Sequence, residues 1–377
     1  MDSMERIPFN KTYISGREAE YIQNVIKNGH LSGDGLYTEL CKKWLDEYFA
    51  PGVSLLTNSC TAALEMTASL LNIDNGDEVI MPSYTFVSTA NAFISKGAIP
   101  VFVDIRRDTL NINEDLIEES ITSKTRAIVV VHYAGVSCEM EKIISIAKKY
   151  NLYVIEDAAH AMISTYNGAP LGSIGDFGTV SFHDTKNIIA GEGGALLVNN
   201  SNFIDRAEII RDKGTNRKKF LRGEIDKYTW VDEGSSHVPS EMISAFLYAQ
   251  LENAKYITNI RKEIWQEYHS NLEILEQKSK ITRPIIPEGA NHNGHIYYLL
   301  LPDNKTRDKF IIAMKEKGIS CTFHYVPLHS SPAGSKIGKY ISKPKITEEI
   351  SERMVRLPIW PTIDSQRVIE TTISELS

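Results

Sequence analysis

Seven short apolar segments alternate with helical patterns between residues 53 and 198 of this chain. Parallel strands must be joined by crossover connections, so this alternation predicts a mostly parallel sheet with helices on both faces. Ligands of such sheets bind beyond the carboxyl ends of the strands, which makes polar residues there candidates for a site. The predicted strands are Val53–Thr57, Glu78–Pro82, Ile99–Ile105, Ala127–His132, Leu152–Glu156, Thr179–Phe182 and Ala195–Val198, and the helices between them include Thr61–Leu71 and Met140–Tyr150.

Two domains are expected, because 377 residues exceed what one hydrophobic core usually supports. We predict a large α/β domain over residues 1–250, which includes an amino-terminal arm, and a small carboxy-terminal α/β domain over residues 251–377. A long helical stretch from Pro239 to about Gln277 is expected to bridge them. Further predicted helices are Arg17–Lys27, Thr38–Phe49, Arg307–Lys317 and Thr347–Arg356, and further strands are His295–Leu301 and Ile319–Tyr325.

The composition argues against several classes of protein. A net charge of −7 disfavours a general nucleic-acid or membrane-surface binder, because such proteins present basic surfaces. No apolar run approaches the length of a membrane span, and no secretory pattern follows Met1, so a cytoplasmic location is expected. No metal site is expected, since the four cysteines lack the short paired spacing of zinc ligands: Cys41, Cys60, Cys138 and Cys321.

One segment joins a lysine to a glycine-rich loop directly after a predicted strand: Ser181-Phe-His-Asp-Thr-Lys-Asn-Ile-Ile-Ala-Gly-Glu-Gly-Gly194. Desolvation lowers the pKa of a lysine, and its free amine can then bind an aldehyde cofactor covalently and carry protons. Taken alone, Lys186 resembles an ordinary surface lysine. Its neighbours are what make pyridoxal phosphate the expected cofactor.

Asp157 and His160 directly follow another predicted strand. A carboxylate at the end of an apolar strand can keep the ring nitrogen of pyridoxal phosphate protonated, which makes the cofactor an electron sink. His160 can hydrogen-bond the phenolic oxygen of the same ring. The alternatives are a helix N-cap for Asp157 and a satisfied core histidine for His160.

Three other segments supply candidate contacts to the cofactor or substrate. Cys60 and Thr61 begin a helix after a strand, where free backbone amides favour a phosphate, and Ser181 adds a hydroxyl. Phe86 follows a strand and offers a flat side chain that can stack on the pyridine ring. The segment His324-Tyr325 lies close to Pro327 in a rigid loop suited to ligand contact. Ordinary capping and core packing are the alternatives.

Taken in order, these motifs closely resemble the DegT/DnrJ/EryC1/StrS family of sugar aminotransferases. The resemblance extends over nearly the whole chain, which makes it far more specific than any single motif. The segments that carry it, besides the lysine and aspartate motifs, are Asp77–Phe93, Val131–Gly135, Lys213–Arg217, Asp226–Trp230, Phe323–Tyr325 and Pro327–His329.

The resemblance implies a type I aminotransferase fold with a seven-stranded sheet, and a homodimer with active sites at the subunit interface. It also implies L-glutamate as donor, a dTDP-4-keto-6-deoxyglucose acceptor, and a cofactor that alternates between pyridoxal and pyridoxamine phosphate. By position, Lys186 binds the cofactor covalently, Asp157 pairs with the ring nitrogen, His160 reaches the phenolic oxygen and Phe86 stacks. Cys60, Thr61 and Ser181 hold the phosphate, and Arg222, Lys227, Tyr228, His324 and Tyr325 contact the sugar nucleotide.

The chain departs from the family at two places. Close relatives often have glutamine at the position of His160, and either side chain can make the hydrogen bond. Some members bring an asparagine from the second subunit to the phosphate, whereas the matching segment Ser235–Glu241 contains none, so Ser235 or Ser236 is the candidate there.

Other activities stay open at this stage. Transamination at C3, or at C4 with an equatorial amine, needs only a shifted substrate. Dehydration is disfavoured, because the sugar dehydratases among the relatives carry histidine in place of Lys186. A cofactor-binding regulator without turnover is the non-enzymatic alternative.

Overall fold

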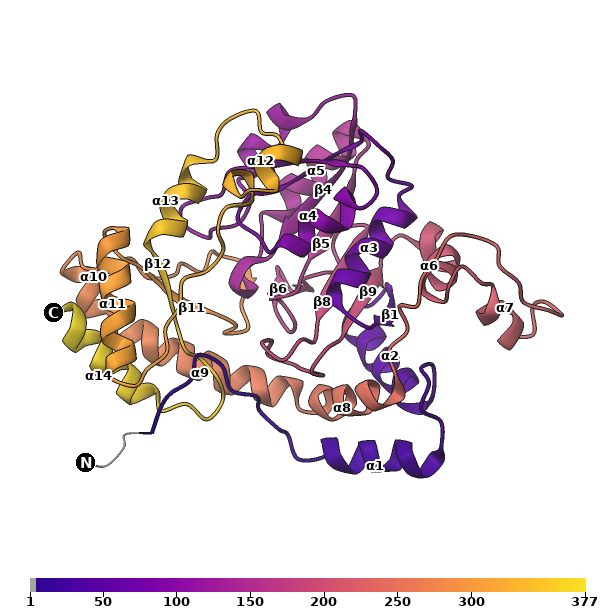
Figure 1. Ribbon diagram of the computed structural model, residues 1–377, viewed down its shortest axis with the longest axis horizontal. Coiled ribbons are helices and arrows are strands. Elements are labelled where there is room, and N and C mark those ends of the chain that lie inside the picture. Colours follow the sequence, from indigo (N-terminus) through magenta and orange to yellow (C-terminus); the bar gives the residue numbers. More distant parts are fainter. Residues whose placement is uncertain (1–4) are drawn as a thin grey trace.

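A seven-stranded sheet forms the centre of the protein in the computed structural model, which describes residues 5–377 (Figure 1). The strand order is β1-β9-β8-β5-β4-β2-β3, and only β9 runs antiparallel to the others. The mostly parallel sheet is thereby confirmed. Its strands are β1 (Val53–Thr57), β2 (Glu78–Pro82), β3 (Ile99–Val103), β4 (Thr125–Val131), β5 (Tyr153–Asp157), β8 (Phe177–Ser181) and β9 (Gly194–Val198).

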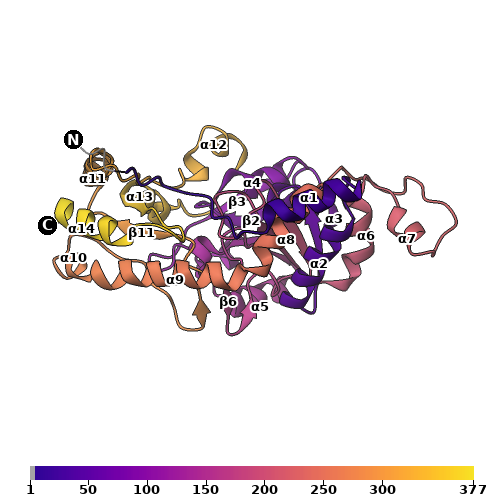
Figure 2. The ribbon, with the colours of Figure 1, turned by 90° about the horizontal axis from the view of Figure 1, so that it is seen from below.

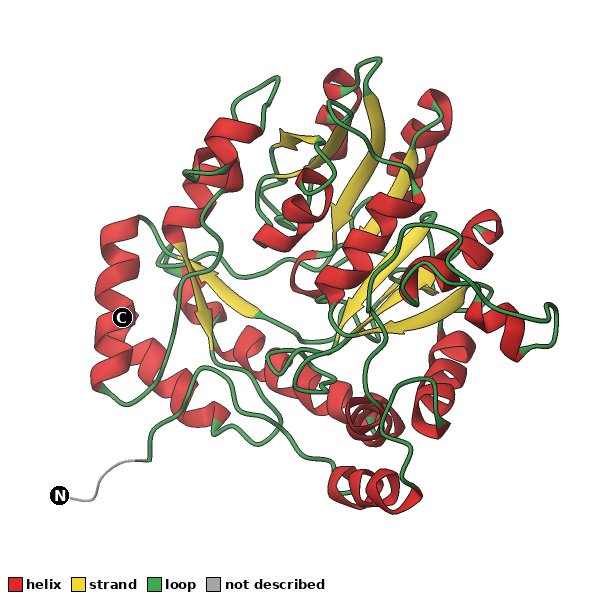
Figure 3. Ribbon diagram, turned by 45° about the vertical axis from the view of Figure 1, so that its right-hand side comes forward, coloured by secondary structure: helices red, strands yellow, loops and turns green. Residues whose placement is uncertain are grey.

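Helices cover both faces of this sheet, as the view in Figure 3 shows. Successive side chains of a strand point to opposite faces, so Val79 and Met81 of β2 join one core cluster while Ile80 joins another. The first face is covered by α3 (Cys60–Leu70), α4 (Val87–Ile94) and α6 (Ile204–Arg211). The opposite face is covered by α2 (Leu36–Tyr48), α5 (Met140–Tyr150) and α8 (Glu241–Glu252).

A separate hydrophobic core lies in the carboxy-terminal part of the chain, around a two-stranded antiparallel sheet. This sheet consists of β11 (Tyr297–Leu300) and β12 (Met354–Leu357), and α9 (Ala254–Asn271), α11 (Asn304–Glu316) and α14 (Ser365–Leu376) pack around it. Ile7 also belongs to this core, so the amino-terminal segment crosses from one part of the protein to the other. The domain boundary at residues 250 and 251 stays a prediction.

The predicted bridge between residues 239 and 277 is divided into three helices. α8 and α9 follow one another along one side of the molecule (Figure 2), and α10 (Glu273–Gln277) completes the stretch. The remaining elements are α1 (Glu18–Asn28), α7 (Arg217–Leu221), α12 (Gly334–Ile337), α13 (Lys345–Arg353), and a small sheet of β6 (Thr165–Tyr166), β7 (Ala169–Pro170) and β10 (Ala290–Asn291).

Two predictions for the carboxy-terminal part were wrong. The segment Ile319–Tyr325 forms no strand and makes only isolated bridges, in which Ile319 pairs with Ile7. The helix predicted over Thr347–Arg356 ends at Arg353, and Met354–Leu357 is strand β12 instead. Pairing with β11 buries Met354 and Leu357 in the core, which outweighs the local helical pattern.

Within residues 5–377, no helix combines the length and the apolar character needed to cross a membrane. The same residues contain no cluster of histidine, cysteine and carboxylate side chains suited to a metal ion. Residues 1–4 of the predicted large domain lie outside the described part.

Candidate active site

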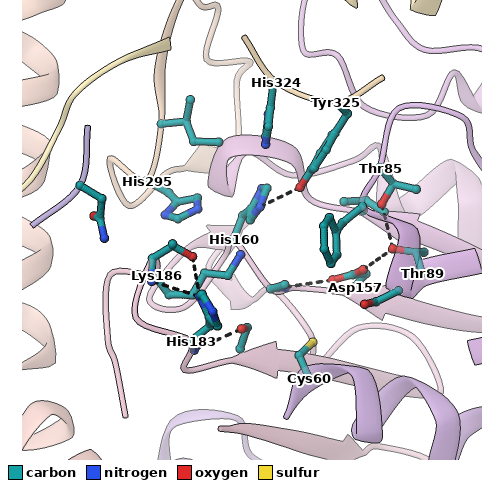
Figure 4. A pocket seen from close by; sticks show the side chains of 18 of the residues that line it. Cys60, Thr85, Thr89, Asp157, His160, His183, Lys186, His295, His324 and Tyr325 are labelled. Atoms are coloured by element: carbon teal, nitrogen blue, oxygen red, sulfur yellow. Dashed lines mark hydrogen bonds between the residues drawn. The ribbon is translucent and has the colours of Figure 1, made fainter. Parts of the chain in front are cut away.

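A cavity of about 520 Å³ lies at the carboxyl ends of the central strands, where parallel sheets usually bind ligands (Figure 4). Residues of the sheet domain, of the carboxy-terminal core and of the amino-terminal segment all line it. The predicted site residues that it brings together are Cys60, Thr61, Phe86, Asp157, His160, Ser181, Lys186, His324 and Tyr325.

Asp157 ends β5 and lies in the cavity wall with 5% of its surface exposed. Its Oδ2 accepts a hydrogen bond from Thr89 Oγ1 at 2.8 Å, and its Oδ1 accepts one from the amide of Ala159 at 3.2 Å. Burial raises the pKa of this carboxyl, while the hydrogen bonds and the charge of Lys186 act in the opposite direction. No helix begins directly after Asp157, so the N-cap alternative is wrong. A cationic ring nitrogen is the kind of partner this carboxylate lacks.

Lys186 lies in the loop between β8 and β9 and lines the same cavity. The loop is closed at its base, because the amide of Asp184 donates to Gly191 O at 2.9 Å and the amide of Lys186 donates to His183 O at 2.9 Å. Burial lowers the pKa of Lys186, and Arg356 lowers it further, against the opposing effect of Cys60 and Asp157. Its amine therefore loses its proton more readily than that of a surface lysine.

The amino terminus of α3 offers an anion-binding cup in the cavity wall. Ser59 caps the helix with its own hydroxyl, but the backbone amides of Cys60 and Thr61 find no acceptor within residues 5–377. Gly194 packs directly against this turn, since a Cβ there would lie 2.4 Å from Cys60 N. Free amides, the positive end of the helix dipole and the nearby hydroxyl of Ser181 suit a phosphate.

His160 is held as a neutral donor at the other side of the cavity (Figure 4). Its Nδ1 faces the amide of Ala134 at 3.4 Å, which assigns the proton to Nε2, and Nε2 lies 3.2 Å from the hydroxyl of Tyr325. The pKa of His160 is well below its usual value because of burial and the charges of Lys186 and Arg356. The rings of His160 and Tyr325 are nearly parallel, with an interplanar angle of 10°. His160 can thus donate to an oxygen in the cavity.

His295 is a cavity residue that the sequence did not single out. Its Nδ1 lies 2.8 Å from Asn187 Oδ1, and Asn187 Nδ2 donates to Asn293 O at 2.9 Å. Because Asn187 directly follows Lys186, this network ties the lysine loop to the chain that leads into β11. The sequence signal was the histidine-rich run Asn291-His-Asn-Gly-His295, although nothing in it specified the partner.

Phe86 lines the cavity with 56% of its surface exposed, and its ring centroid lies 6.4 Å from that of Tyr325. The structure therefore leaves its face available, as the stacking hypothesis requires. His324 is stacked on Tyr325 at 3.7 Å, and its Nδ1 lies 2.6 Å from the hydroxyl of Tyr133. These aromatic side chains line the same cavity as Asp157.

Arg222, Lys227 and Tyr228 do not reach the cavity of their own chain. They lie in the loop directly after α7, which projects together with that helix from the body of the molecule (Figures 1 and 2). Arg222 forms ion pairs with Glu208 and Glu224, and the side chain of Tyr228 is 51% exposed. Their assignment as substrate-binding residues stays a prediction.

The residues present fit pyridoxal phosphate on three independent observations. Two unpartnered amides and Ser181 supply a phosphate cup, Asp157 is a buried carboxylate with no ion pair among the described residues, and Lys186 is a desolvated amine. All three line one cavity. Cys60, Thr61, Asp157, His160, Ser181 and Lys186 are therefore the residues that would hold the group.

Comparisons with known proteins show the family to which the chain is similar. The sequence profile of the DegT/DnrJ/EryC1/StrS aminotransferase family matches residues 12–373. An uncharacterized protein of Methanocaldococcus jannaschii, MJ1066, is 37% identical over 89% of this chain and 86% of its own length. GDP-perosamine synthase of Escherichia coli O157:H7 is 30% identical over 97% of this chain and 96% of its own length.

One solved protein bears on the cofactor. Spr1654 of Streptococcus pneumoniae, which is assigned as a sugar aminotransferase, was solved in its PMP form and its PLP form. The PMP form superimposes with a TM-score of 0.90 at 26% identity, over 98% of both chains. The PLP form superimposes with a TM-score of 0.88, over 99% of this chain and 100% of that one.

Proposed function

This chain belongs to the DegT/DnrJ/EryC1/StrS aminotransferase family, and from that membership we propose the reaction that it catalyses. It is a pyridoxal phosphate-dependent sugar aminotransferase. The proposed reaction moves the amino group of L-glutamate to C4 of dTDP-4-keto-6-deoxy-D-glucose. The products are dTDP-4-amino-4,6-dideoxy-D-galactose and 2-oxoglutarate.

The observation that carries the transaminase chemistry is the meeting of Lys186, Asp157 and the start of α3 in one cavity. Pyridoxal phosphate, when bound there, supplies a protonated ring that withdraws electrons from the reacting carbon of the substrate. Asp157 would stabilise the positive charge of the ring nitrogen, and the amides of Cys60 and Thr61 would hold the phosphate. His160 would donate a hydrogen bond from Nε2 to the phenolic oxygen.

Lys186 is the acid and base of both half-reactions in this proposal. Its Nζ removes the proton from the α-carbon of L-glutamate, and in the second half-reaction Nζ delivers a proton to C4 of the sugar. A lowered pKa suits this exchange, because the amine must be free at the start and protonated only transiently. Phe86, His324 and Tyr325 supply aromatic surface to the cavity in which the reaction is proposed to take place.

The proposed acceptor is supported by the resemblance of several motifs to dTDP-4-amino-4,6-dideoxygalactose transaminase. The segments concerned are Asp77–Phe93, Asp226–Trp230 and Phe323–His329. A relative named GDP-perosamine synthase makes a guanosine nucleotide the first alternative to thymidine. The amino sugar is then expected to enter surface polysaccharide synthesis, in line with a further relative, SpsC of Bacillus subtilis, a spore coat polysaccharide biosynthesis protein.

We also propose a homodimer in which α7 and its loop reach the cavity of the partner subunit. Support comes from the exposed apolar surface there, because Leu221 is 60% and Trp230 is 78% exposed. Lys227 carries a charge without an ion pair among the described residues, which suits a diphosphate. Ser236 lies close to the phosphate cup of its own chain, since its carbonyl accepts from Asn58 Nδ2 at 3.1 Å, so a contact of Ser236 with the partner's phosphate stays a prediction without support from this geometry.

The test is to incubate the protein with pyridoxal phosphate, L-glutamate and dTDP-4-keto-6-deoxyglucose, and to identify the nucleotide amino sugar by mass and NMR. An axial amine at C4 supports the proposal. Product only from the GDP-linked sugar or from a 3-keto isomer would refute the acceptor, and an equatorial amine at C4 would refute the galacto product. The donor stands in each of these cases. Lys186→Ala is expected to abolish product formation, and normal turnover by this variant would refute the mechanism.

The dimer is tested separately by mixing two inactive variants. Lys186→Ala inactivates the cavity, and Lys227→Ala with Tyr228→Ala inactivates the projecting loop. If the loop acts in the partner's cavity, a 1:1 mixture regains about a quarter of the wild-type activity, because half of the dimers are mixed and each mixed dimer has one intact site of two. No recovery after subunit exchange would refute this arrangement.

A further inference from the structure

Arg356 is a cavity residue to which neither the cofactor chemistry nor the sugar assignment gives a role. It lies on β12 and lines the cavity together with Lys186. Most arginines of the described chain pair with carboxylates, but Arg356 forms no ion pair with any residue between 5 and 377. An unpaired cation in a partly buried wall is costly unless a ligand completes it.

The guanidinium of Arg356 is held in place from two sides, and most of its donors are left free. Its Nε and Nη2 both donate to Phe323 O, at 3.4 and 3.3 Å, and its Cζ lies 4.7 Å from the ring centroid of Phe9. Its Nη1 has no acceptor in the part of the chain that the structure describes. A guanidinium carries five N–H donors in a planar fork, so this one is oriented and still able to bind a carboxylate with two hydrogen bonds.

The backbone of Arg356 is equally fixed. Its amide donates to Thr322 O at 2.7 Å, the amide of Thr322 donates back at 3.3 Å, and Arg356 pairs with Tyr298 in β11. A ligand therefore meets a preorganised cation rather than a flexible surface side chain.

Arg261 is the other arginine of the cavity wall without an ion pair among residues 5–377, but its contacts indicate a structural role. It is 4% exposed, and it donates from Nε to Gly294 O at 3.3 Å and from Nη2 to His295 O at 2.9 Å. These bonds hold two successive carbonyls of the segment before β11. Arg356, whose only acceptor is a single carbonyl, is the better candidate for a ligand.

We infer that Arg356 binds the α-carboxylate of the amino donor, and that it forms a subsite used in the first half-reaction only. The inference rests on the proposed function, because it requires an amino-acid donor that reacts at Lys186. In an α-amino acid, the amine and the carboxylate are attached to the same carbon. A cation that binds this carboxylate must therefore lie close to the reacting amine.

Arg356 lies in the part of the cavity where the reacting amine is expected. A residue that binds the diphosphate of the sugar nucleotide would not lie there. Arg356 lines the same cavity as Lys186, His160 and His295, and its charge lowers the pKa of all three. The diphosphate of a sugar nucleotide is attached at C1, at the opposite end of the hexose ring from the reacting C4. A cation for the diphosphate is thus expected farther from Lys186, and the neutral hexose offers Arg356 no anion in the second half-reaction.

The charges of the cavity wall agree with this assignment. Lys186, Arg261 and Arg356 are the lysine and arginine residues that line it, whereas Asp157 and Glu192 are its only carboxylates within the described chain. Asp157 faces the ring nitrogen in the proposed function. The entry of L-glutamate brings the negative charge that the wall around Arg356 lacks.

The test measures the two half-reactions separately in wild type, Arg356→Gln and Arg356→Lys. The absorbance change of the pyridoxal form with L-glutamate reports the first, and that of the pyridoxamine form with the keto sugar reports the second. Loss of a charge-assisted hydrogen-bond pair is expected to weaken glutamate binding about 10- to 150-fold in Arg356→Gln. The glutamate affinity of Arg356→Lys is expected to lie between those of wild type and Arg356→Gln, because lysine keeps the charge and loses the planar fork. The keto-sugar half-reaction is expected to change less than about threefold.

A second readout avoids turnover altogether. Glutarate has two carboxylates and no reactive group, and its binding to the pyridoxal form by calorimetry should weaken in the same order across the variants. Arg107→Gln is the matched control, because Arg107 is 59% exposed, pairs with Glu349 and lies outside the cavity wall. Unchanged thermal melting and cofactor absorbance of the Arg356 variants verify that they are folded.

The outcomes separate the two claims. A loss confined to the glutamate half-reaction and to glutarate binding supports the subsite. An equal loss in both half-reactions, a loss confined to the keto sugar, or no loss overturns it while the aminotransferase assignment stands. A wild-type enzyme that L-glutamate does not convert refutes the proposed donor, and the subsite with it.

Discussion

Gly194 is a position where one added carbon atom should weaken the binding of pyridoxal phosphate. It begins β9 and lies against the first turn of α3. A Cβ at Gly194 would meet Cys60 N at 2.4 Å, Ser59 C at 2.5 Å and Ser59 O at 2.7 Å. All three atoms belong to the backbone that forms the phosphate cup, so no side-chain rotation can relieve the contact.

The size of the effect follows from this geometry. A comfortable contact lies near 3.5 Å, so Gly194→Ala must separate β9 and α3 by about 1 Å. Overpacking of this kind costs about 1–3 kcal/mol, and the shift also displaces the two free amides from the anion. The amide–phosphate bonds are charge-assisted and sensitive to distance. We expect pyridoxal phosphate to bind Gly194→Ala at least about tenfold more weakly, which corresponds to about 1.4 kcal/mol.

Gly193→Ala is the matched control, one residue earlier in the same loop. A Cβ at Gly193 meets only side-chain carbons, at 3.4 Å from Ala190, 3.5 Å from Phe182 and 3.8 Å from Ile243. Titration of the cofactor-free variants with pyridoxal phosphate, followed by absorbance and thermal melting, should show a large defect in Gly194→Ala and a small one in Gly193→Ala. Wild-type affinity and melting in Gly194→Ala, or equal defects in both, would refute the reasoning.

Three further predictions concern the residues around the cavity. Glu156→Gln should lower the melting temperature by several degrees. The fully buried Glu156 carboxylate accepts four hydrogen bonds, and the NH₂ group of a glutamine would face some of the donors and could not accept from them. An unchanged melting temperature would contradict this. The rate of cofactor capture should rise with pH and level off below about 10.4, the ordinary pKa of lysine, since burial lowers the pKa of Lys186 and only the free amine reacts; an inflection at or above that value would contradict this. Thr89→Val should raise the pKa of Asp157 further and weaken cofactor binding about tenfold, because it removes the 2.8 Å hydrogen bond to Oδ2; equal affinity would exclude a role for this bond.

The parallel sheet was predictable because its strands carry their own signal. Buried parallel strands are nearly continuous apolar runs, and the bounds of Val53–Thr57 and Glu78–Pro82 agree with those of β1 and β2. The carboxy-terminal part was harder. Met354–Leu357 continues a helical pattern, and it becomes a strand only because β11, more than fifty residues earlier, offers it a partner. Long-range pairing of this kind leaves no local trace in the sequence.

The site divides in the same way. Lys186, Asp157 and the start of α3 are each attached to the end of a strand, and parallel strands bring their carboxyl ends to one edge, so their meeting follows from the sheet. Thr89 and Arg356 reach the cavity from elements whose packing the sequence does not specify. The location of α7 is different again, because its residues are predicted to act on a second copy of the chain.

This division suggests how one cavity can serve two unlike substrates. The groups that would hold the cofactor come from the sheet, whose strands fix their positions through the core of the large domain. The proposed donor cation comes from β12 of the carboxy-terminal core, and three of the proposed acceptor contacts, Arg222, Lys227 and Tyr228, come from the loop after α7 of a partner. Since Arg356 and these three residues lie on separate structural elements, donor and acceptor specificity can change independently at these positions. Replacing Arg356 should therefore alter the amino donor and leave the sugar untouched, whereas changes at Lys227 or Tyr228 should do the reverse.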